Sequence, residues 1–222
     1  MRTKGSESYL ARSGTNRDAV DPAMVGKAEA SPRVYIPGTV LPLMPENEHA
    51  PFSTLESAFV LFGGGLSLSQ LCEMTGINAT TIQNWVKRGW VPNPVNKKYG
   101  RRQVARVLLI NLMRPAMQLD HIAHLLGSIN GAVEDESDDN VEETALFDLL
   151  CCAVIRMERR AAISPSVCEQ IAAEVMAVNG GGIPQEARKQ VSDVLLLMLL
   201  NMAAAQFMHR AARLYAEIGE CI

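Results

Sequence analysis

The chain has 222 residues, of which 48% are hydrophobic, 5% aromatic and 20% charged, and its formal net charge is −3. It is long enough to bury a hydrophobic core, so disulfide staples are not needed, and it fits one large or two small domains. Few aromatic residues beside abundant Leu, Ala, Met and Val predict a mainly helical protein.

The N-terminal part is not expected to be helical. Residues 1–33 are rich in Ser, Gly, Asp and basic residues, which predicts a disordered tail, and they contain no apolar run of the signal-peptide type. Residues 34–52 alternate apolar residues with prolines, which fix φ and lack an N–H group. We expect this segment to be an extended strap that lies across a globular core.

A domain is predicted over residues 53–130, and it opens with a short helix. Ser53 and Glu56 have the spacing of a capping box, and Gly63–Gly65 would stop the helix. One face of this segment would carry Leu55, Ala58, Phe59 and Phe62.

Two helices joined by a tight turn follow, over Ser69–Thr75 and Ala79–Arg88. Gly76 supplies the backbone freedom that the turn needs, and Ile77 would fill the space between the helices. The second helix divides into two faces at helical spacing. The apolar face holds Ile82, Trp85 and Val86, and the polar face holds Thr80, Gln83, Asn84 and Lys87.

The polar face of this second helix carries groups suited to DNA. Gln83 and Asn84 can each pair bidentately with adenine in the major groove. Lys87 and Arg88 match the charge of the phosphate backbone. We therefore expect this helix to be the reading element.

A small basic wing is predicted next. Trp90–Val95 is extended because of its prolines, and Asn96–Gly100 has the composition of a turn and a return strand. Arg101, Arg102 and Arg106 then fall in the first turns of a further helix, where cations oppose the helix dipole. Their position predicts a counter-charge from outside the chain, such as phosphate.

Charge is distributed unevenly along the chain. Residues 68–128 hold eight Lys or Arg and two acids, whereas residues 131–150 hold eight acids and no Lys or Arg. A basic segment beside an acidic one suggests nucleic acid as a partner. The run at 131–143 is interpreted as a solvated acidic linker, with the sharper alternative that it covers the basic face and weakens non-specific binding.

Residues 144–222 are predicted to form a C-terminal helical domain. One helix would run from about Val141 to Arg160, a second would start at Ser164–Pro165 and stop at Asn179–Gly182, and a third would run from Pro184 to Ile218. The first of these would carry Leu146, Leu149, Leu150, Ala153 and Met157 on one face.

The last helix contains an apolar run, Val194–Met208, in which 13 of the 15 residues are apolar. The run is too short for a membrane span, and Asn201 and Gln206 interrupt it, so no membrane association is expected. We predict the central helix of a bundle or the seam of a homodimer. The heptad-like positions are Val191, Val194 or Leu195, Met198, Met202 and Ala205.

No site for catalysis, metal or cofactor is predicted. The five cysteines contain no CxxC pair, which favours reduced, mostly buried thiols and a cytoplasmic location. His121 and His124 are interpreted as a surface pair. No phosphate-binding loop, nucleophile elbow or spaced set of metal ligands occurs, so enzymatic activity is not expected.

The stretch from Leu68 to Leu126 resembles the winged helix-turn-helix of the MerR family. The likeness rests on LSLSQLCEMTGINATTIQNWVKRGWVPNP and QVARVLLINLMRPAMQLDHIAHLL, with Gly76 at the turn and Pro92 opening the wing. Residues 34–200 also look like an uncharacterised bacterial family that shares this unit and an acidic stretch. This second resemblance implies a regulator without a known activity.

Together these features predict a mainly α protein, in which a MerR-like winged helix-turn-helix precedes a C-terminal helical bundle. The predicted function is a DNA-binding regulator of transcription that forms a homodimer through its C-terminal helices. The alternative is a protein-interaction or scaffold module whose winged helix no longer binds DNA. The expected contacts to double-stranded DNA are Thr80, Thr81, Gln83, Asn84, Lys87, Arg88, Lys97, Lys98, Tyr99, Arg101 and Arg102.

Overall fold

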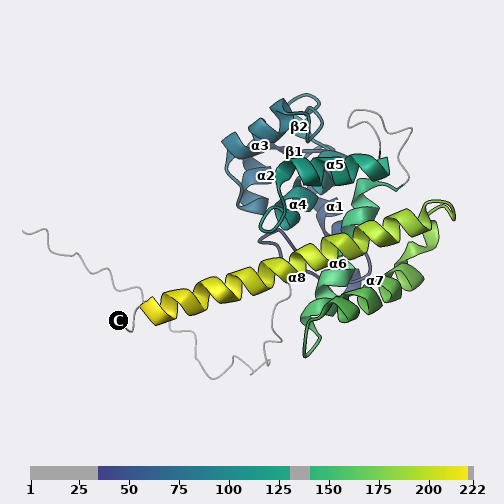
Figure 1. The fold of residues 1–222 in the computed structure, drawn as a ribbon. Coiled ribbons are helices and arrows are strands. Elements are labelled where there is room, and N and C mark those ends of the chain that lie inside the picture. Colours follow the sequence, from purple (N-terminus) through teal and green to yellow (C-terminus); the bar gives the residue numbers. More distant parts are fainter. Residues whose placement is uncertain (1–34, 131–140, 220–222) are drawn as a thin grey trace, which may run out of the picture. The chain divides into compact units, whose positions relative to one another are not determined.

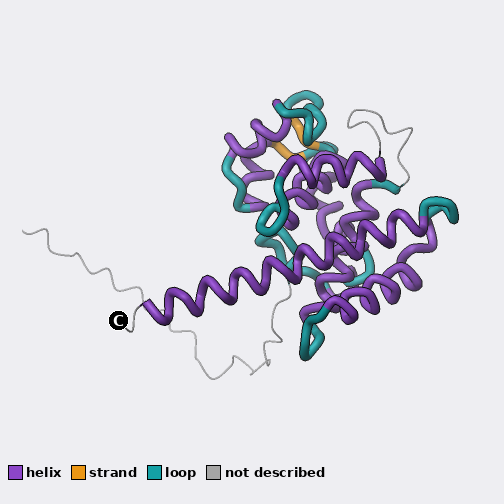
Figure 2. Tube along the Cα trace, in the orientation of Figure 1, coloured by secondary structure: helices purple, strands orange, loops and turns teal. Residues whose placement is uncertain are grey.

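The structure is a computed structural model, and it describes residues 35–130 and 141–219. Over these ranges the chain is mainly helical, as predicted, with one antiparallel sheet of two short strands (Figures 1 and 2). The predicted disordered tail, 1–33, and residues 131–140 of the predicted acidic linker lie outside the described residues.

The strap before the first helix consists of turns and two 3-10 helices, η2 (Pro45–Asn47) and η3 (Pro51–Leu55). One end is fixed where the N–H of Val40 donates to the carbonyl of Met74, at 3.0 Å. The other end is fixed where the N–H of Phe52 donates to the Asp148 carboxylate, at 2.7 Å. The strap buries Ile36, Leu43, Phe52 and Leu55, so the prediction that it lies across the core is confirmed.

Helix α1 (Glu56–Leu61) begins later than the predicted capping box implies. Ser53 belongs to η3 instead, and its hydroxyl donates to the carbonyl of Ala50 at 2.6 Å. The predicted stop at Gly63–Gly65 is confirmed, since the first two of these glycines have φ values of 70° and 88°. Phe62, which was predicted on one face with Leu55 and Phe59, is exposed while those two are buried, because it follows the end of the helix.

Strand β1 (Leu66–Ser67) leads into α2 (Leu68–Thr75), and α3 (Ala79–Lys87) follows after a three-residue turn, close to the predicted bounds. Local signals account for these bounds. Ser67 and Gln70 form a capping box at the start of α2, and Gly76 ends it with a φ of 70°. The side chain of Asn78 caps α3 by accepting the N–H of Thr81 at 2.8 Å.

The predicted wing is a tight hairpin. Strand β2 (Lys98–Tyr99) pairs antiparallel with β1. Val95 and Lys98 exchange two backbone hydrogen bonds, at 3.0 and 2.9 Å, and the two residues between them, Asn96 and Lys97, have φ values of 50° and 62°. Two consecutive residues with positive φ are the signature of a two-residue hairpin turn that matches the twist of its strands.

Five further helices follow in the described chain, with the 3-10 helix η4 (Gly180–Gly182) between the last two. The predicted Ser164 cap is confirmed, because this hydroxyl accepts the N–H of Val167 at 3.3 Å. The final helix begins at Arg188 and not at Pro184. The bounds are α4 (Arg101–Met113), α5 (Leu119–Asn130), α6 (Glu143–Glu158), α7 (Pro165–Asn179) and α8 (Arg188–Gly219).

The central helix is α6 rather than the last helix. Its predicted apolar face is buried, and Phe147, Cys151, Cys152, Val154 and Ile155 on its other sides are buried as well. It packs against η3, α4, α7 and α8. The buried residues of α4 and α6 belong to one hydrophobic cluster, and the described residues from 35 on fall in one compact unit, so the described parts of the predicted domains 53–130 and 144–222 share a core.

Helix α8 meets this core through its N-terminal half only. Of the heptad-like positions predicted for a bundle or a dimer seam, Val191, Leu195 and Met198 are fully buried in the chain's own core, so these three belong to the bundle. From Phe207 to Gly219 every side chain is exposed. This C-terminal half, drawn in yellow, extends away from the other helices (Figure 1).

Candidate nucleic-acid interface

The polar face of α3 lies on the surface, as predicted. Ile82 and Trp85 are buried, at 0% and 2% exposed, and they hold the helix by its inner side. The opposite side is exposed and carries two cations, two amides and a hydroxyl. These exposed residues are Thr80, Gln83, Asn84, Lys87 and Arg88.

Thr81 has a different place from its neighbours. It is half-buried, and its hydroxyl donates to the Asn78 side chain at 2.8 Å, the same oxygen that accepts its N–H. Both polar groups of Thr81 therefore support the cap of α3. Thr81 positions the helix and is not free to reach outward.

Two aromatic rings near α3 lie against arginines. The guanidinium of Arg88 lies 5.0 Å from the ring centre of Trp90, and that of Arg114 lies 5.9 Å from the ring centre of Trp85. Such cation–π contacts restrict the arginine without neutralising its charge. Arg88 is thus an ordered, exposed cation beside the end of α3.

The hairpin presents one lysine at its tip. Lys97 is exposed and lies in the turn itself. Lys98 is also exposed, but its ammonium donates to the carbonyl of Phe62 and so fastens the hairpin to the end of α1. Of the two wing lysines, Lys97 is the exposed one whose ammonium makes no hydrogen bond with the described backbone.

Tyr99 was expected at the surface of the wing and is found in the core. It is 3% exposed and pairs with Leu66 across the small sheet. Burial raises the pKa of its hydroxyl. Because side chains alternate along a strand, the exposure of Lys98 places Tyr99 on the inner face.

Arg101 is held by a carboxylate of the same chain. Its Nε donates to both oxygens of Glu56, at 2.8 and 2.9 Å, and its guanidinium lies 5.3 Å from the ring centre of Phe59. The guanidinium also holds the pKa of Glu56 below its usual range. The counter-charge that the sequence placed outside the chain is therefore supplied from within.

The same correction applies to Arg102 and Arg106. Both bind Glu143, the last acid of the predicted linker: Arg102 Nε donates to one oxygen at 3.1 Å, and Arg106 Nη1 donates to the other. Glu143 is 2% exposed and Arg106 is 1% exposed. Glu143 is thus a buried structural anion, and the prediction of a solvated linker is wrong at this residue.

Six of the eleven predicted DNA contacts remain as one exposed set. Within the described residues none of the six takes part in an ion pair. The set carries three positive charges and no negative one. Its members are Thr80, Gln83, Asn84, Lys87, Arg88 and Lys97.

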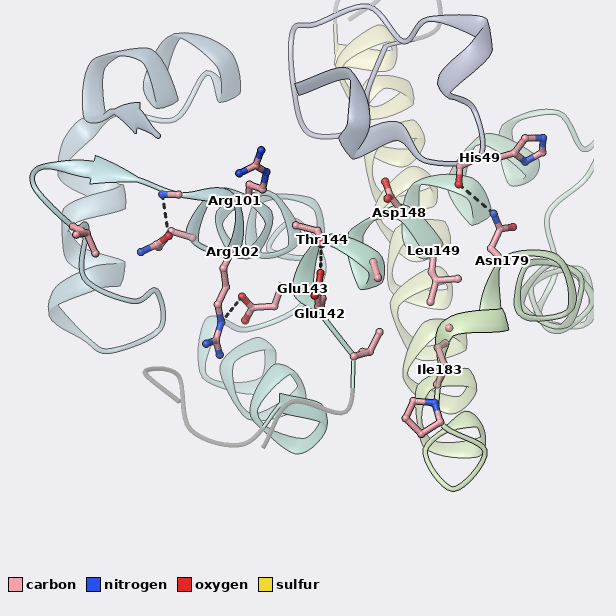
Figure 3. A pocket seen from close by; sticks show the side chains of 17 residues that line it. His49, Arg101, Arg102, Glu142, Glu143, Thr144, Asp148, Leu149, Asn179 and Ile183 are labelled. Carbon is pink, nitrogen blue, oxygen red and sulfur yellow. Dashed lines mark hydrogen bonds and ion pairs between the residues drawn. The ribbon is translucent and has the colours of Figure 1, made fainter. Parts of the chain in front are cut away.

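A cavity of about 990 Å³ lies between the strap, the N-terminal ends of α4 and α6, and the end of α7 (Figure 3). The side chain of Asn179 donates to the carbonyl of His49 at 3.2 Å, while its own oxygen is buried without a partner in the described structure. Burial raises the pKa of Asp148 to about 6, although the N–H of Phe52 opposes this shift. The sequence did not predict this cavity, because its walls come from four separate segments.

The cysteine prediction is confirmed for three residues. Cys151, Cys152 and Cys168 are buried. Burial raises the pKa of Cys152 to about 11, and the nearby Asp148 adds to the shift. Thiols in this state are unreactive packing groups.

The predicted surface histidines are found at the surface. His121 and His124 are exposed on α5. In the part of the chain that the structure describes, no three His, Cys, Asp or Glu side chains gather in a group that could hold a metal ion.

Helix α8 is long and apolar enough to cross a membrane by length and composition alone, with a mean hydropathy of 1.7 over its most apolar window.

Part of the chain is similar to uncharacterised proteins. Residues 65–148 match the family described as "Domain of unknown function (DUF1836)". The "Uncharacterized protein YkrK" of Bacillus subtilis (strain 168) is 31% identical over 94 residues, which is 40% of this chain and 40% of that relative. No solved structure matches. The predicted likeness to an uncharacterised family is confirmed over the matched segment, which begins just before α2 and ends within α6.

Proposed function

We propose that this chain is a DNA-binding regulator of transcription, in which α2, the turn, α3 and the hairpin act as a MerR-like winged helix-turn-helix. The observation that carries the proposal is the exposed face of α3, which bears amides and cations but no acid. A helix about 10–12 Å across fits the major groove, which is about 12 Å wide. The buried inner face of α3 keeps this reading face fixed.

In the proposed complex five of the six exposed residues take one of two roles. Gln83 and Asn84 read base edges, because amides pair bidentately with adenine. Lys87, Arg88 and Lys97 neutralise phosphates on either side of the groove. Arg88 suits this role because its contact with a ring limits the conformations that it must lose on binding.

Arg101 and Arg102 are given a different role from the one that the sequence suggested. Each is bound to a carboxylate of the chain, so a phosphate would have to displace Glu56 or Glu143. In the proposal they orient α4, against which α2 and the strand β2 of the hairpin pack. We further propose a cytoplasmic homodimer, because two copies supply the symmetric half-site contacts that a single unit lacks.

A second candidate function has its own observation. Val60 and Leu61 are 76% and 77% exposed at the end of α1, and Val95 is 68% exposed on the hairpin. Exposed apolar residues of this size mark protein-binding surfaces when they gather. A protein-interaction module would use these residues and would not need the cations of α3.

Recovery of bound DNA from cells tests the two functions against each other. The full chain is cross-linked in its host and the associated fragments are sequenced, beside the Gln83→Ala/Asn84→Ala variant. The proposal predicts enrichment of a shared motif that is lost in the variant. Equal recovery of the same fragments by both proteins would instead support the interaction module.

A further inference from the structure

The exposed half of α8 carries a regular apolar stripe. Phe207, Ala211, Leu214 and Ile218 follow one another at intervals of four, three and four residues, and all are exposed. This alternation is the repeat of a coiled-coil seam, in which two helices pack along their a and d positions. It lies on a different part of the helix from the buried residues that were predicted as the seam.

Two more apolar residues flank the stripe. Met208 is 59% exposed and Tyr215 is 81% exposed, and they are seven residues apart on the same side of it. The other side carries Arg210 and Glu217, which are also seven residues apart and of opposite charge. The stripe therefore has one apolar edge and one charged edge.

We infer that this segment binds the same segment of a second copy of this chain in an antiparallel pair. In that arrangement like edges face each other, so Arg210 of each copy lies opposite Glu217 of the other. The same register sets Ala211 against Leu214 and Phe207 against Ile218. The apolar edges then bring Met208 of one copy against Tyr215 of the other.

Other pairings of the two helices fit less well. A shift by one heptad places the two copies of Arg210 against each other, which is unfavourable. A parallel pair sets Ala211 against Ala211 and leaves Arg210 without an acid opposite it. Of these arrangements, only the proposed antiparallel register sets the small Ala211 against the larger Leu214 and the cation of Arg210 against the anion of Glu217.

The length of the exposed segment agrees with this register. If Ala211 lies opposite Leu214, then Gly219 at the end of the described helix lies opposite Gln206. Gln206 is the last residue of α8 that is not classed as exposed, so the described part of the second helix would reach to the point where the core of the first begins. The pair thus covers the solvent-exposed turns without requiring any change in the core.

A lipid bilayer is the competing occupant of this apolar helix. However, the exposed half contains His209, Arg210, Arg213 and Glu217 within nine residues. Charged side chains at bilayer depth are costly, whereas at the edges of a helix pair they stay in water. The distribution of charge therefore favours a second copy over a membrane.

The inference is independent of DNA binding and is tested on the full chain without DNA. Sedimentation equilibrium should show a dimer for the native chain and a monomer for Leu214→Glu, with at least a tenfold rise in the dissociation constant. Because the side chain of Leu214 is exposed in the single chain, Leu214→Glu should keep its helical circular dichroism. His209→Glu, on the side of the helix away from the stripe, should remain dimeric.

Three results would overturn the inference. The first is a native chain that is monomeric at about 100 μM, since useful dimers form well below this concentration. The second is a Leu214→Glu variant that stays dimeric. The third is native protein that pellets with membranes after lysis.

Cysteine cross-linking tests the orientation. In a background with Cys72→Ser and Cys221→Ser, chains with Ala211→Cys and chains with Leu214→Cys are mixed and oxidised. The antiparallel register predicts a disulfide between the two kinds of chain in the mixture. A parallel pair would instead link Ala211→Cys to itself, and this outcome would exclude the proposed geometry.

Charge reversal tests the register. Arg210→Glu and Glu217→Arg should each weaken the dimer by roughly 3- to 10-fold, in the range of exposed ion pairs. The double variant restores opposite charges across the pair and should recover most of the loss. Additive losses in the double variant would contradict the proposed register.

Discussion

Arg106 and Glu143 form an ion pair that is almost completely buried, with the two side chains 1% and 0% exposed. Arg106 also donates from Nε to the carbonyl of Trp90, at 2.6 Å. Arg106 on α4 therefore connects Trp90, which follows α3, to Glu143 in the first turn of α6. It lies within the part of the chain that matches the uncharacterised family.

Removing one partner of this pair should be strongly destabilising. Arg106→Met leaves the Glu143 carboxylate buried with fewer partners, and Glu143→Gln leaves a buried guanidinium without its counter-charge. Each should lower the free energy of unfolding by about 3–5 kcal/mol, measured by urea denaturation. The double variant should lose clearly less than the sum, and strictly additive losses would show that the two groups are not coupled.

Lys97→Gly should stabilise the hairpin. Lys97 has a φ of 62°, which L-residues adopt at a cost and glycine adopts freely. We expect a gain of a few tenths to about 1 kcal/mol in the free energy of unfolding, since the greater freedom of glycine in the unfolded chain opposes the relief. Lys97→Ala is the matched control, because it removes the charge but keeps the restricted backbone. Equal stability of both variants would argue against the tight turn.

The same two variants test the proposed phosphate contact. Both remove one positive charge at the tip of the hairpin, so both should weaken DNA binding and lower the salt slope by about one. If only one of the two variants lost affinity for DNA, the effect would be due to the shape of the turn rather than to its charge.

Asp148 should make stability depend on pH. Desolvation raises its pKa from 3.8 in the unfolded chain to about 6 in the folded protein. Between these values the folded state holds a proton that the unfolded state has lost, so the free energy of unfolding falls as pH rises from about 4 to about 6 and stays lower above. Asp148→Asn can still accept the N–H of Phe52 but does not titrate.

The readout is the difference in unfolding free energy between the native chain and Asp148→Asn at several pH values. Other titrating groups are common to both proteins and cancel. The native chain should lose stability relative to the variant across this window, and a constant difference from pH 4 to pH 7 would contradict the raised pKa.

The proposed reading face of α3 predicts two different effects of substitutions on affinity for DNA. Gln83→Ala should reduce affinity for the preferred duplex by about 1–3 kcal/mol and leave affinity for unrelated duplexes nearly unchanged. Lys87→Ala should weaken both by similar amounts. Gln170→Ala, an exposed change on α7, serves as the control. A uniform loss for Gln83→Ala would remove this residue from base reading.

The elements around the candidate site could be predicted because their signals are local. Gly76 and Asn78 mark the turn between α2 and α3, and Ser164 marks the start of α7. The polar face of α3 could be predicted from helical periodicity alone, because Ile82 and Trp85 mark the buried side of the same helix.

What could not be predicted depends on residues far apart in the sequence. The helix-dipole rule indicated a counter-charge near Arg101 and Arg106, but not that Glu56 and Glu143 would supply it from 45 and 37 residues away. Tyr99 was misplaced because its burial depends on pairing with β1, which is too short to show a periodic pattern.

The last helix shows a limit of a different kind. A helix that is apolar on most sides gives no indication of which side meets the core. In α8 the core takes Val191, Leu195 and Met198, and the stripe that begins at Phe207 is left exposed.

The most direct test of the central claim is the salt dependence of binding to double-stranded DNA. The purified full chain is titrated onto genomic duplex fragments between about 50 and 200 mM salt, beside the variant Lys87→Ala/Arg88→Ala/Lys97→Ala. The account predicts a steep linear fall of log K with log salt, and a slope that is shallower by about two to three units in the variant. No binding at low salt, or a slope that the triple variant leaves unchanged, would contradict it.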